Sequence, residues 1–145
     1  MASRMFNALA RLLSAFANRF RCGLIQFRYT GVSIGRSVII DRGVYIRALD
    51  GGNIHIGQNT HIWRNSIIEA RGGNLHIGAN GLVNAGCYLL ATSKIEIGEN
   101  ALIAEYVTIR DQDHAHERNG QPYTQQGRVE APIIIGDNVW IGAKS

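Results

Sequence analysis

The chain has little proline, little cysteine and no long apolar run. Only 2 of its 145 residues are proline and 2 are cysteine. Cys22 and Cys87 show no CxxC spacing, which argues against a disulfide framework and indicates reduced thiols of a cytosolic protein. No apolar run reaches the roughly 18–20 residues that span a bilayer. Arg11 and Arg19 interrupt the N-terminal apolar stretch, so it does not read as a signal sequence.

Acidic residues are absent from the first part of the chain. Residues 1–40 contain six arginines and no acid, and the first acid is Asp41, although the formal net charge of the whole chain is only +4. A basic segment of this kind suits a nucleic acid or an anionic membrane surface. No pattern of base-stacking aromatic residues accompanies it, so we expect no nucleic-acid partner.

Glycine, in contrast, is abundant, and an Ile-Gly dipeptide returns along the chain. The dipeptides start at residues 34, 56, 77, 97 and 135, in steps of 22, 21, 20 and 38 residues. Between them aliphatic residues recur every six positions, as in Ile77, Val83 and Leu89. A six-residue period fits neither a helix nor an isolated strand. It predicts an all-β solenoid with triangular coils, in which three six-residue sides and small corner insertions make one turn.

The six-residue period also predicts which side chains fill the core. The expected inward positions are Ile34, Ile40, Ile46, Ile56, Ile62, Ile68, Ile77, Val83, Leu89, Ile97, Ile103 and Ile109. A slip by one residue would turn this ladder outward, so the period fixes the register. An asparagine follows four of the glycines by two residues, and asparagine tolerates left-handed turns, which predicts an asparagine ladder at one corner. These residues are Asn59, Asn80, Asn100 and Asn138.

Residues 1–22 are expected to form an amphipathic helix, and residues 23–145 the β-solenoid. The apolar residues at helical spacing are Met5, Phe6, Leu9, Leu12, Leu13, Phe16 and Phe20. Two roles stay open for this helix. It can cap the open end of the solenoid, as terminal repeats require, or lie on an anionic membrane as a peripheral contact.

Residues 110–131 break the period with a polar segment, and the repeat resumes at Pro132. A long loop that leaves a rigid solenoid is a typical place for function. The chain stops at Ser145, partway through a unit and without a cap. We therefore expect a fragment truncated at its C-terminus. The alternative is a partner chain that covers this end.

Two of the five histidines, His114 and His116, start the polar loop beside Asp113. A nearby carboxylate can fix the tautomer of a histidine and raise its basicity, which suits a general base. A zinc site would need a third ligand from elsewhere in the coils. We expect no metal, because the remaining histidines are predicted to face outward.

Those remaining histidines are expected to be structural. His55 and His76 each precede an inward isoleucine, and Glu96 occupies the same slot one coil later. The three are predicted to form an outward ladder on a solvated face. His61, near another corner, is expected to be exposed.

Three segments together resemble a known family. They are NAGCYL at 84–89, IRDQDHAH at 109–116 and APIIIGDNVWIGA at 131–143. They resemble the hexapeptide-repeat acyltransferases, left-handed parallel β-helix enzymes, and especially the maltose and galactoside O-acetyltransferase group with its relatives in polysaccharide biosynthesis. The resemblance implies a homotrimer with active sites between subunits. It also implies direct transfer of an acetyl group from acetyl-CoA to a hydroxyl of a sugar or glycan precursor, without metal or covalent intermediate.

The resemblance also implies roles for individual residues. His114 matches the general base that deprotonates the acceptor. The other matched positions are Asn84, Asp113 and His116 for acceptor binding, and Trp140 and Ala143 for acetyl-CoA binding.

Two departures from the family pattern matter. The family's further coils, which complete the acetyl-CoA site, are missing after Ser145, and the N-terminal segment is basic where sugar-specific members are acidic. The second departure favours relatives that act on envelope or exopolysaccharide precursors, which are often lipid-linked. A cytoplasmic protein, peripheral at the inner face of the cytoplasmic membrane, is the resulting expectation. Two alternatives stay open: a non-catalytic solenoid scaffold, and a zinc-dependent enzyme on the same fold.

Overall fold

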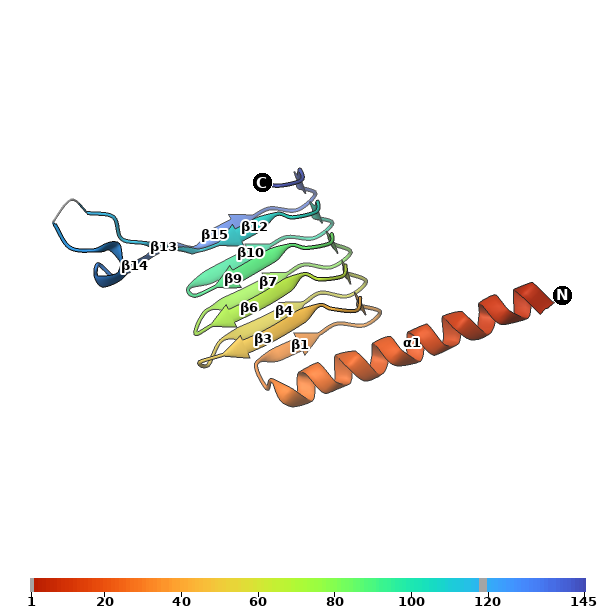
Figure 1. The fold of residues 1–145 in the computed structure, drawn as a ribbon. Helices are drawn as coiled ribbons and strands as arrows, with labels where there is room; N and C mark the ends of the chain where they lie inside the picture. The colour runs from red at the N-terminus through yellow and green to blue at the C-terminus, as the bar shows by residue number, and fades with distance from the viewer. Residues whose placement is uncertain (1, 118–119) are drawn as a thin grey trace.

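The computed structural model describes residues 2–117 and 120–145, without the side chains of residues 2–8 and 11. One helix is followed by a parallel β-solenoid of about four turns, from which a hairpin projects (Figure 1). The predicted left-handed β-helix with an N-terminal helix is confirmed.

Each coil gives one short strand to each of three parallel sheets, which form the sides of the triangle. Sheet A contains β1 (Val32–Ile34), β4 (Asn53–Ile56), β7 (Asn74–Ile77), β10 (Lys94–Ile97) and β15 (Ile133–Ile135). Sheet B contains β2 (Ile39–Ile40), β5 (His61–Ile62), β8 (Leu82–Val83), β11 (Leu102–Ile103) and β16 (Trp140–Ile141). Sheet C contains β3 (Tyr45–Leu49), β6 (Ile67–Arg71), β9 (Tyr88–Ala91) and β12 (Thr108–Arg110).

The predicted inward ladder is confirmed. Ile34 is half-buried against the core, and the other eleven predicted positions are buried. A second ladder on sheet A was not predicted: Ile54, Leu75 and Ile95 are in register and buried. These strands run for four residues, so two alternate side chains of each point inward. The core is therefore wider along sheet A than along sheet B.

The corners of the coils require special backbone conformations. All four predicted asparagines adopt positive φ angles of 56–58°, and the amide of Asn59 donates to the amide oxygen of Asn80 at 3.1 Å. The glycines of the Ile-Gly dipeptides are required for a different reason. A Cβ added at Gly57 would lie 2.4 Å from the backbone nitrogen of Ala79 in the next coil, so only glycine fits there.

Helix α1 spans Ala2–Arg28, beyond the expected end at residue 22. Its C-terminal part covers the first coil: Cys22 and Ile25 pack against the core, and the Arg21 guanidinium donates to the carbonyl of Ile40. Met5 and Phe6 are two of the apolar residues predicted at helical spacing, and their side chains lie outside the part of the chain that the structure describes. Among the described residues, no helix combines the length and apolarity needed to cross a membrane.

The segment expected to be a loop contains regular structure. An antiparallel hairpin pairs β13 (Gln112–His114) with β14 (Arg128–Glu130), and a short 3₁₀ helix (Tyr123–Gln125) lies between them. Sheet A resumes with β15 directly after Pro132, as predicted. The hairpin leaves the solenoid after β12, at the corner between sheets C and A (Figure 1).

Candidate active site

A buried carboxylate fixes the base of the hairpin. Asp111 is 2% exposed and accepts hydrogen bonds from the backbone N–H of Thr92 at 2.8 Å, the Thr92 hydroxyl at 2.9 Å and the backbone N–H of Ser93 at 2.7 Å. Its own carbonyl accepts from the N–H of Ala131, where the chain returns. Asp111 therefore ties both arms of the hairpin to the corner of the previous coil, a role that the sequence analysis did not assign.

His114 ends β13 and is exposed, opposite Arg128 in the hairpin ladder. The carboxylate of Asp113 accepts from the backbone N–H of His114 at 2.8 Å, so it shapes the turn of the backbone rather than holding the ring. Within residues 2–117 and 120–145, the imidazole of His114 makes no hydrogen bond. Both ring nitrogens are therefore open to an incoming group.

The surroundings of His114 are cationic. It lines a small pocket of about 170 Å³ at the base of the hairpin. The other residues that line this pocket are Arg71, Tyr88, Leu90, Arg110, Gln112, Asp113 and Arg128. Arg71 is paired with the buried Glu69, which raises the pKa of Arg71 above its usual value through their hydrogen bond. Arg110 and Arg128 form no ion pair among the described residues, so they can face an anionic group in the pocket.

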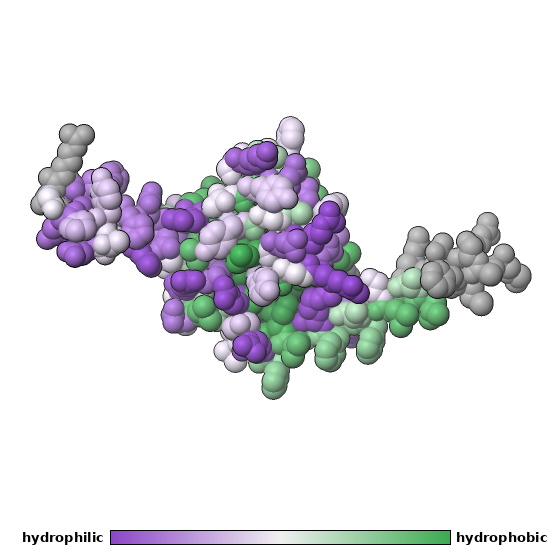
Figure 2. All heavy atoms as spheres, in the orientation of Figure 1, coloured by the Kyte–Doolittle hydropathy of each residue, from purple (hydrophilic) through white to green (hydrophobic). Residues whose placement is uncertain are grey.

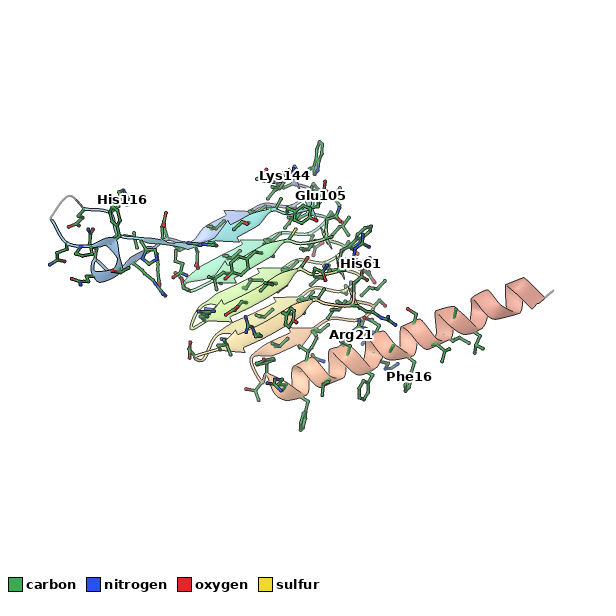
Figure 3. The ribbon with its side chains drawn as sticks, in the orientation of Figure 1. Phe16, Arg21, His61, Glu105, His116 and Lys144 are labelled. Atoms are coloured by element: carbon green, nitrogen blue, oxygen red, sulfur yellow. The ribbon has the colours of Figure 1, made fainter. Side chains whose placement is uncertain are left out.

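His116 lies farther out on the hairpin and is exposed (Figure 3). The chain thus brings together three predicted site residues, His114, Asp113 and His116, in one projecting segment. The other three lie elsewhere.

Asn84 lies at the opposite end of sheet C, at the corner where sheet B ends. Its amide nitrogen is 3.5 Å from the carboxylate of Glu105, and its amide oxygen accepts from the N–H of Ala85 at 2.8 Å. Figure 3 shows Glu105 and His116 on opposite sides of the molecule. Within one chain, Asn84 therefore does not meet His114.

Trp140 and Ala143 belong to the same side as Asn84. Trp140 starts β16 in sheet B, pairs with Leu102 of the coil below and is 77% exposed. Ala143 is exposed just before Lys144, whose N–H donates to the carbonyl of Glu105. The predicted site residues thus form two groups, one on the hairpin and one on sheet B and the corner that follows it.

His61 forms a contact that the sequence analysis missed. Its Nε2 is 2.9 Å from a carboxylate oxygen of Asp41, and the indole N–H of Trp63 donates to its Nδ1 at 3.2 Å. Because Nδ1 accepts, the hydrogen of the neutral ring is on Nε2 and points to Asp41. The ring is half-buried rather than exposed, and both nitrogens are occupied. The one available signal was the 20-residue spacing from Asp41, close to one coil.

The predicted ladder of His55, His76 and Glu96 is confirmed on the outer face of sheet A. The rings of His55 and His76 stack with centroids 4.8 Å apart. Burial, and then the neighbouring His76, lower the pKa of His55 below its usual value. Glu96 pairs with Lys94 at 2.6 Å. In the described part of the chain, no group of three or more His, Cys, Asp or Glu side chains is arranged to hold a metal ion.

Comparisons with known proteins agree with this architecture. The family described as "Hexapeptide repeat of succinyl-transferase" matches residues 21–48 and 132–145. The chain is 32% identical over 108 residues to a protein of Mycobacterium tuberculosis named as a probable acetyltransferase, covering 74% of this chain and 36% of that protein. It is 35% identical over 115 residues to the galactoside O-acetyltransferase of Escherichia coli, covering 77% of this chain and 42% of that protein.

The chain spans about two-fifths of the length of these curated relatives. No solved structure matches it. The coil architecture, the family match and the two relatives agree, and the chain belongs to the hexapeptide-repeat acyltransferase family.

Proposed function

We propose that this protein is an acetyl-CoA-dependent O-acetyltransferase that acts on a sugar or glycan precursor, with His114 as the general base. The observation that carries the proposal is the position of His114. Its ring is exposed, makes no hydrogen bond within the described residues and lines the pocket at the base of the hairpin. The similarity to an acetyltransferase and a galactoside O-acetyltransferase supports the reaction class.

The chemistry needs one base and no covalent intermediate. A ring nitrogen of His114 takes the proton from an acceptor hydroxyl as its oxygen attacks the thioester carbonyl of acetyl-CoA. The carbon–sulfur bond then breaks, the acetyl ester remains on the acceptor, and the thiolate of CoA recovers the proton from the imidazolium. A backbone N–H of a neighbouring coil can stabilise the oxyanion that forms in between.

The arrangement of the site residues favours a homotrimer. His114 and Asn84 lie at opposite ends of sheet C, so one chain cannot bring them to one substrate. A neighbouring subunit that places its Asn84 and Trp140 corner against this chain's hairpin would complete the site. The acceptor would then contact Asp113 and His116 from the hairpin, and acetyl-CoA would contact Trp140 and Ala143 from the corner.

The test is acetyl transfer from acetyl-CoA to a panel of sugars and nucleotide sugars, with the acetylated acceptor identified by mass spectrometry. His114→Ala is expected to lower the rate by about 10²–10⁴-fold, the usual contribution of a general base. The matched control is His76→Ala, which removes an exposed histidine from sheet A and should leave the rate unchanged.

Two results would overturn the proposal. One is equal turnover by wild type and His114→Ala. The other is a folded trimer, extended with further C-terminal coils, that binds no acetyl-CoA and acetylates nothing in the panel, which would favour the solenoid scaffold.

A further inference from the structure

Helix α1 attaches to the solenoid largely through polar side chains. The amide of Asn18 donates to the carbonyl of Val38 at 2.8 Å and accepts from the N–H of Ile40 at 2.9 Å. The side-chain oxygen of Gln26 accepts from the N–H of Ile34 at 2.9 Å. These groups belong to the first coil, which has no earlier coil to pair with. The helix therefore caps the first coil through these hydrogen bonds and through the packing of Cys22 and Ile25 against the core, whereas the large apolar side chains on its other side take no part in the cap.

Those apolar side chains form a continuous exposed row, which we call the apolar stripe. Its members are Leu9 (55% exposed), Leu12 (68%), Leu13 (62%), Phe16 (73%), Phe20 (67%), Leu24 (54%) and Phe27 (86%). At 3.6 residues per turn, the stripe lies roughly half a turn from Asn18 and roughly a third of a turn from Gln26, and it extends for about 27 Å. Figure 2 shows it as a hydrophobic band along α1, on the edge of the molecule away from the coils. Figure 3 shows Phe16 pointing away from the coils and Arg21 toward them.

A row of seven large apolar side chains on one helix exceeds the scattered exposure of ordinary surfaces and marks an interaction site. The charge around it indicates the partner. Residues 1–40 contain six arginines and no acid. Two of these arginines, Arg19 and Arg28, are exposed and flank the stripe on its two sides at helical spacing. Apolar side chains flanked by arginines are typical of helices that lie in the headgroup region of anionic membranes.

We propose that α1 binds an anionic lipid bilayer, with the apolar stripe embedded in the interface and the solenoid standing on the membrane surface. The coils do not obstruct this contact, because they lie on the opposite side of the helix (Figure 2). A second copy of the chain is a poorer occupant. Pairing two stripes would bring arginines of both copies together without an acid from either N-terminal segment to offset them.

Co-sedimentation with vesicles tests this binding without acetyl-CoA or acceptor, so it is independent of the proposed activity. The probes are vesicles of phosphatidylcholine alone and vesicles with an equal part of phosphatidylglycerol. The chain is expected to sediment with the mixed vesicles in about 0.1 M salt. Binding should weaken in about 1 M salt, where the Debye length falls from about 10 Å to about 3 Å.

Two sets of variants separate the contribution of the apolar stripe to vesicle binding from that of the flanking arginines. Phe16→Gln with Phe20→Gln should lower the partition coefficient by more than about tenfold, because two large apolar side chains are lost from the interface. Arg19→Gln and Arg28→Gln should each lower binding to the mixed vesicles by about fivefold, which corresponds to about 1 kcal/mol per basic residue. The matched control is Tyr45→Gln with Ile134→Gln, which removes two side chains of similar exposure, 61% and 62%, from the solenoid and should leave binding unchanged.

Wild-type protein that stays in the supernatant with the mixed vesicles would overturn the proposal. So would equal losses in the stripe and control variants. Analytical ultracentrifugation of the same variants adds a further test. A stripe variant that lowers the oligomeric mass while vesicle binding is absent would assign the stripe to a second copy instead.

Discussion

The coils and the hairpin differ in how tightly the backbone constrains each side chain. In the coils, Ile68 is fully buried and Gly57 touches the backbone of the next coil. In the hairpin, Val129 is 58% exposed, and the main anchor is the single carboxylate of Asp111. Stability is therefore concentrated in the coils, and the histidine proposed for catalysis lies in the part with the least packing. Sequence changes in the hairpin should therefore alter the surroundings of His114 without unfolding the protein.

The largest difference in stability is expected between shortening a side chain of the core and shortening a side chain of the hairpin. Ile68→Ala removes a fully buried side chain and should lower the free energy of unfolding by about 2–5 kcal/mol. Val129→Ala removes an exposed one and should change it by less than about 0.5 kcal/mol. Urea unfolding followed by circular dichroism measures both. Similar losses in the two variants would mean that the hairpin contributes to the core of the fold.

A second contrast lies within the Ile-Gly marks themselves. Gly57→Ala should destabilise the protein by about 1–3 kcal/mol, because the new methyl group meets backbone atoms of the next coil. Gly136→Ala, at the same repeat position, meets nothing within 4 Å and should stabilise the protein by about 0.4–1 kcal/mol. Thermal unfolding of the pair checks this, and a destabilising Gly136→Ala would contradict it.

Asp111→Asn should loosen the hairpin more than the solenoid. The two oxygens of the Asp111 carboxylate accept from the N–H groups of Thr92 and Ser93, whereas an asparagine side chain has only one oxygen that can accept. One of the two N–H groups therefore loses its hydrogen-bond partner, which should cost about 1–3 kcal/mol of stability. Hydrogen exchange is expected to speed up at Ala131 while the amides of the coils stay protected. Asp113→Asn is the exposed control. Equal exchange in both variants would show that Asp111 is not the anchor.

The smallest effect is expected from pH. Burial and His76 lower the pKa of His55, so protonation favours the unfolded chain. The stabilising contribution is present above the ordinary histidine pKa of about 6.5 and is lost as the pH falls through the lowered value. The melting temperature of wild type should thus decline below about pH 6.5, and His55→Gln should flatten that decline. An unchanged slope in the variant would assign the pH dependence to other groups.

The sequence predicted the coils well because their rules are local. A six-residue period places Ile62 and Ile68 inward whatever the other coils contain, and a glycine two residues earlier marks Asn59 for a left-handed turn. The stacked neighbours follow from a step of 20–22 residues, which placed His55 beside His76.

The contacts that escaped prediction depend on where coils end or meet. Asn18 and Gln26 bind backbone groups that are free only because no coil precedes the first one, so the docked side of α1 could not be read from its apolar spacing. Asp41 directly follows β2 and meets His61 of the neighbouring strand β5 diagonally, because the register pairs His61 with Ile39. The sequences of β13 and β14 show no clear alternation of apolar and polar residues, because both strands are exposed and largely polar. Their pairing was therefore not predicted. Asn84 and His114 are separated by the strands of sheet C. The motifs that carry the resemblance do not show this separation.

The hairpin departs from the fourth strand of sheet C, whereas α1 lies under the first coil. Neighbouring strands are about 4.8 Å apart, so the hairpin base stands about 14 Å above the coil that α1 caps. The number of coils between α1 and the hairpin therefore sets the distance of the hairpin from α1, in steps of one strand spacing. Inserting or deleting one coil between them would raise or lower His114 by about 5 Å while leaving its local surroundings intact. Taken together, the proposed acetyl transfer and the proposed membrane contact predict that this height sets the shortest membrane-anchored glycan whose hydroxyl can reach His114.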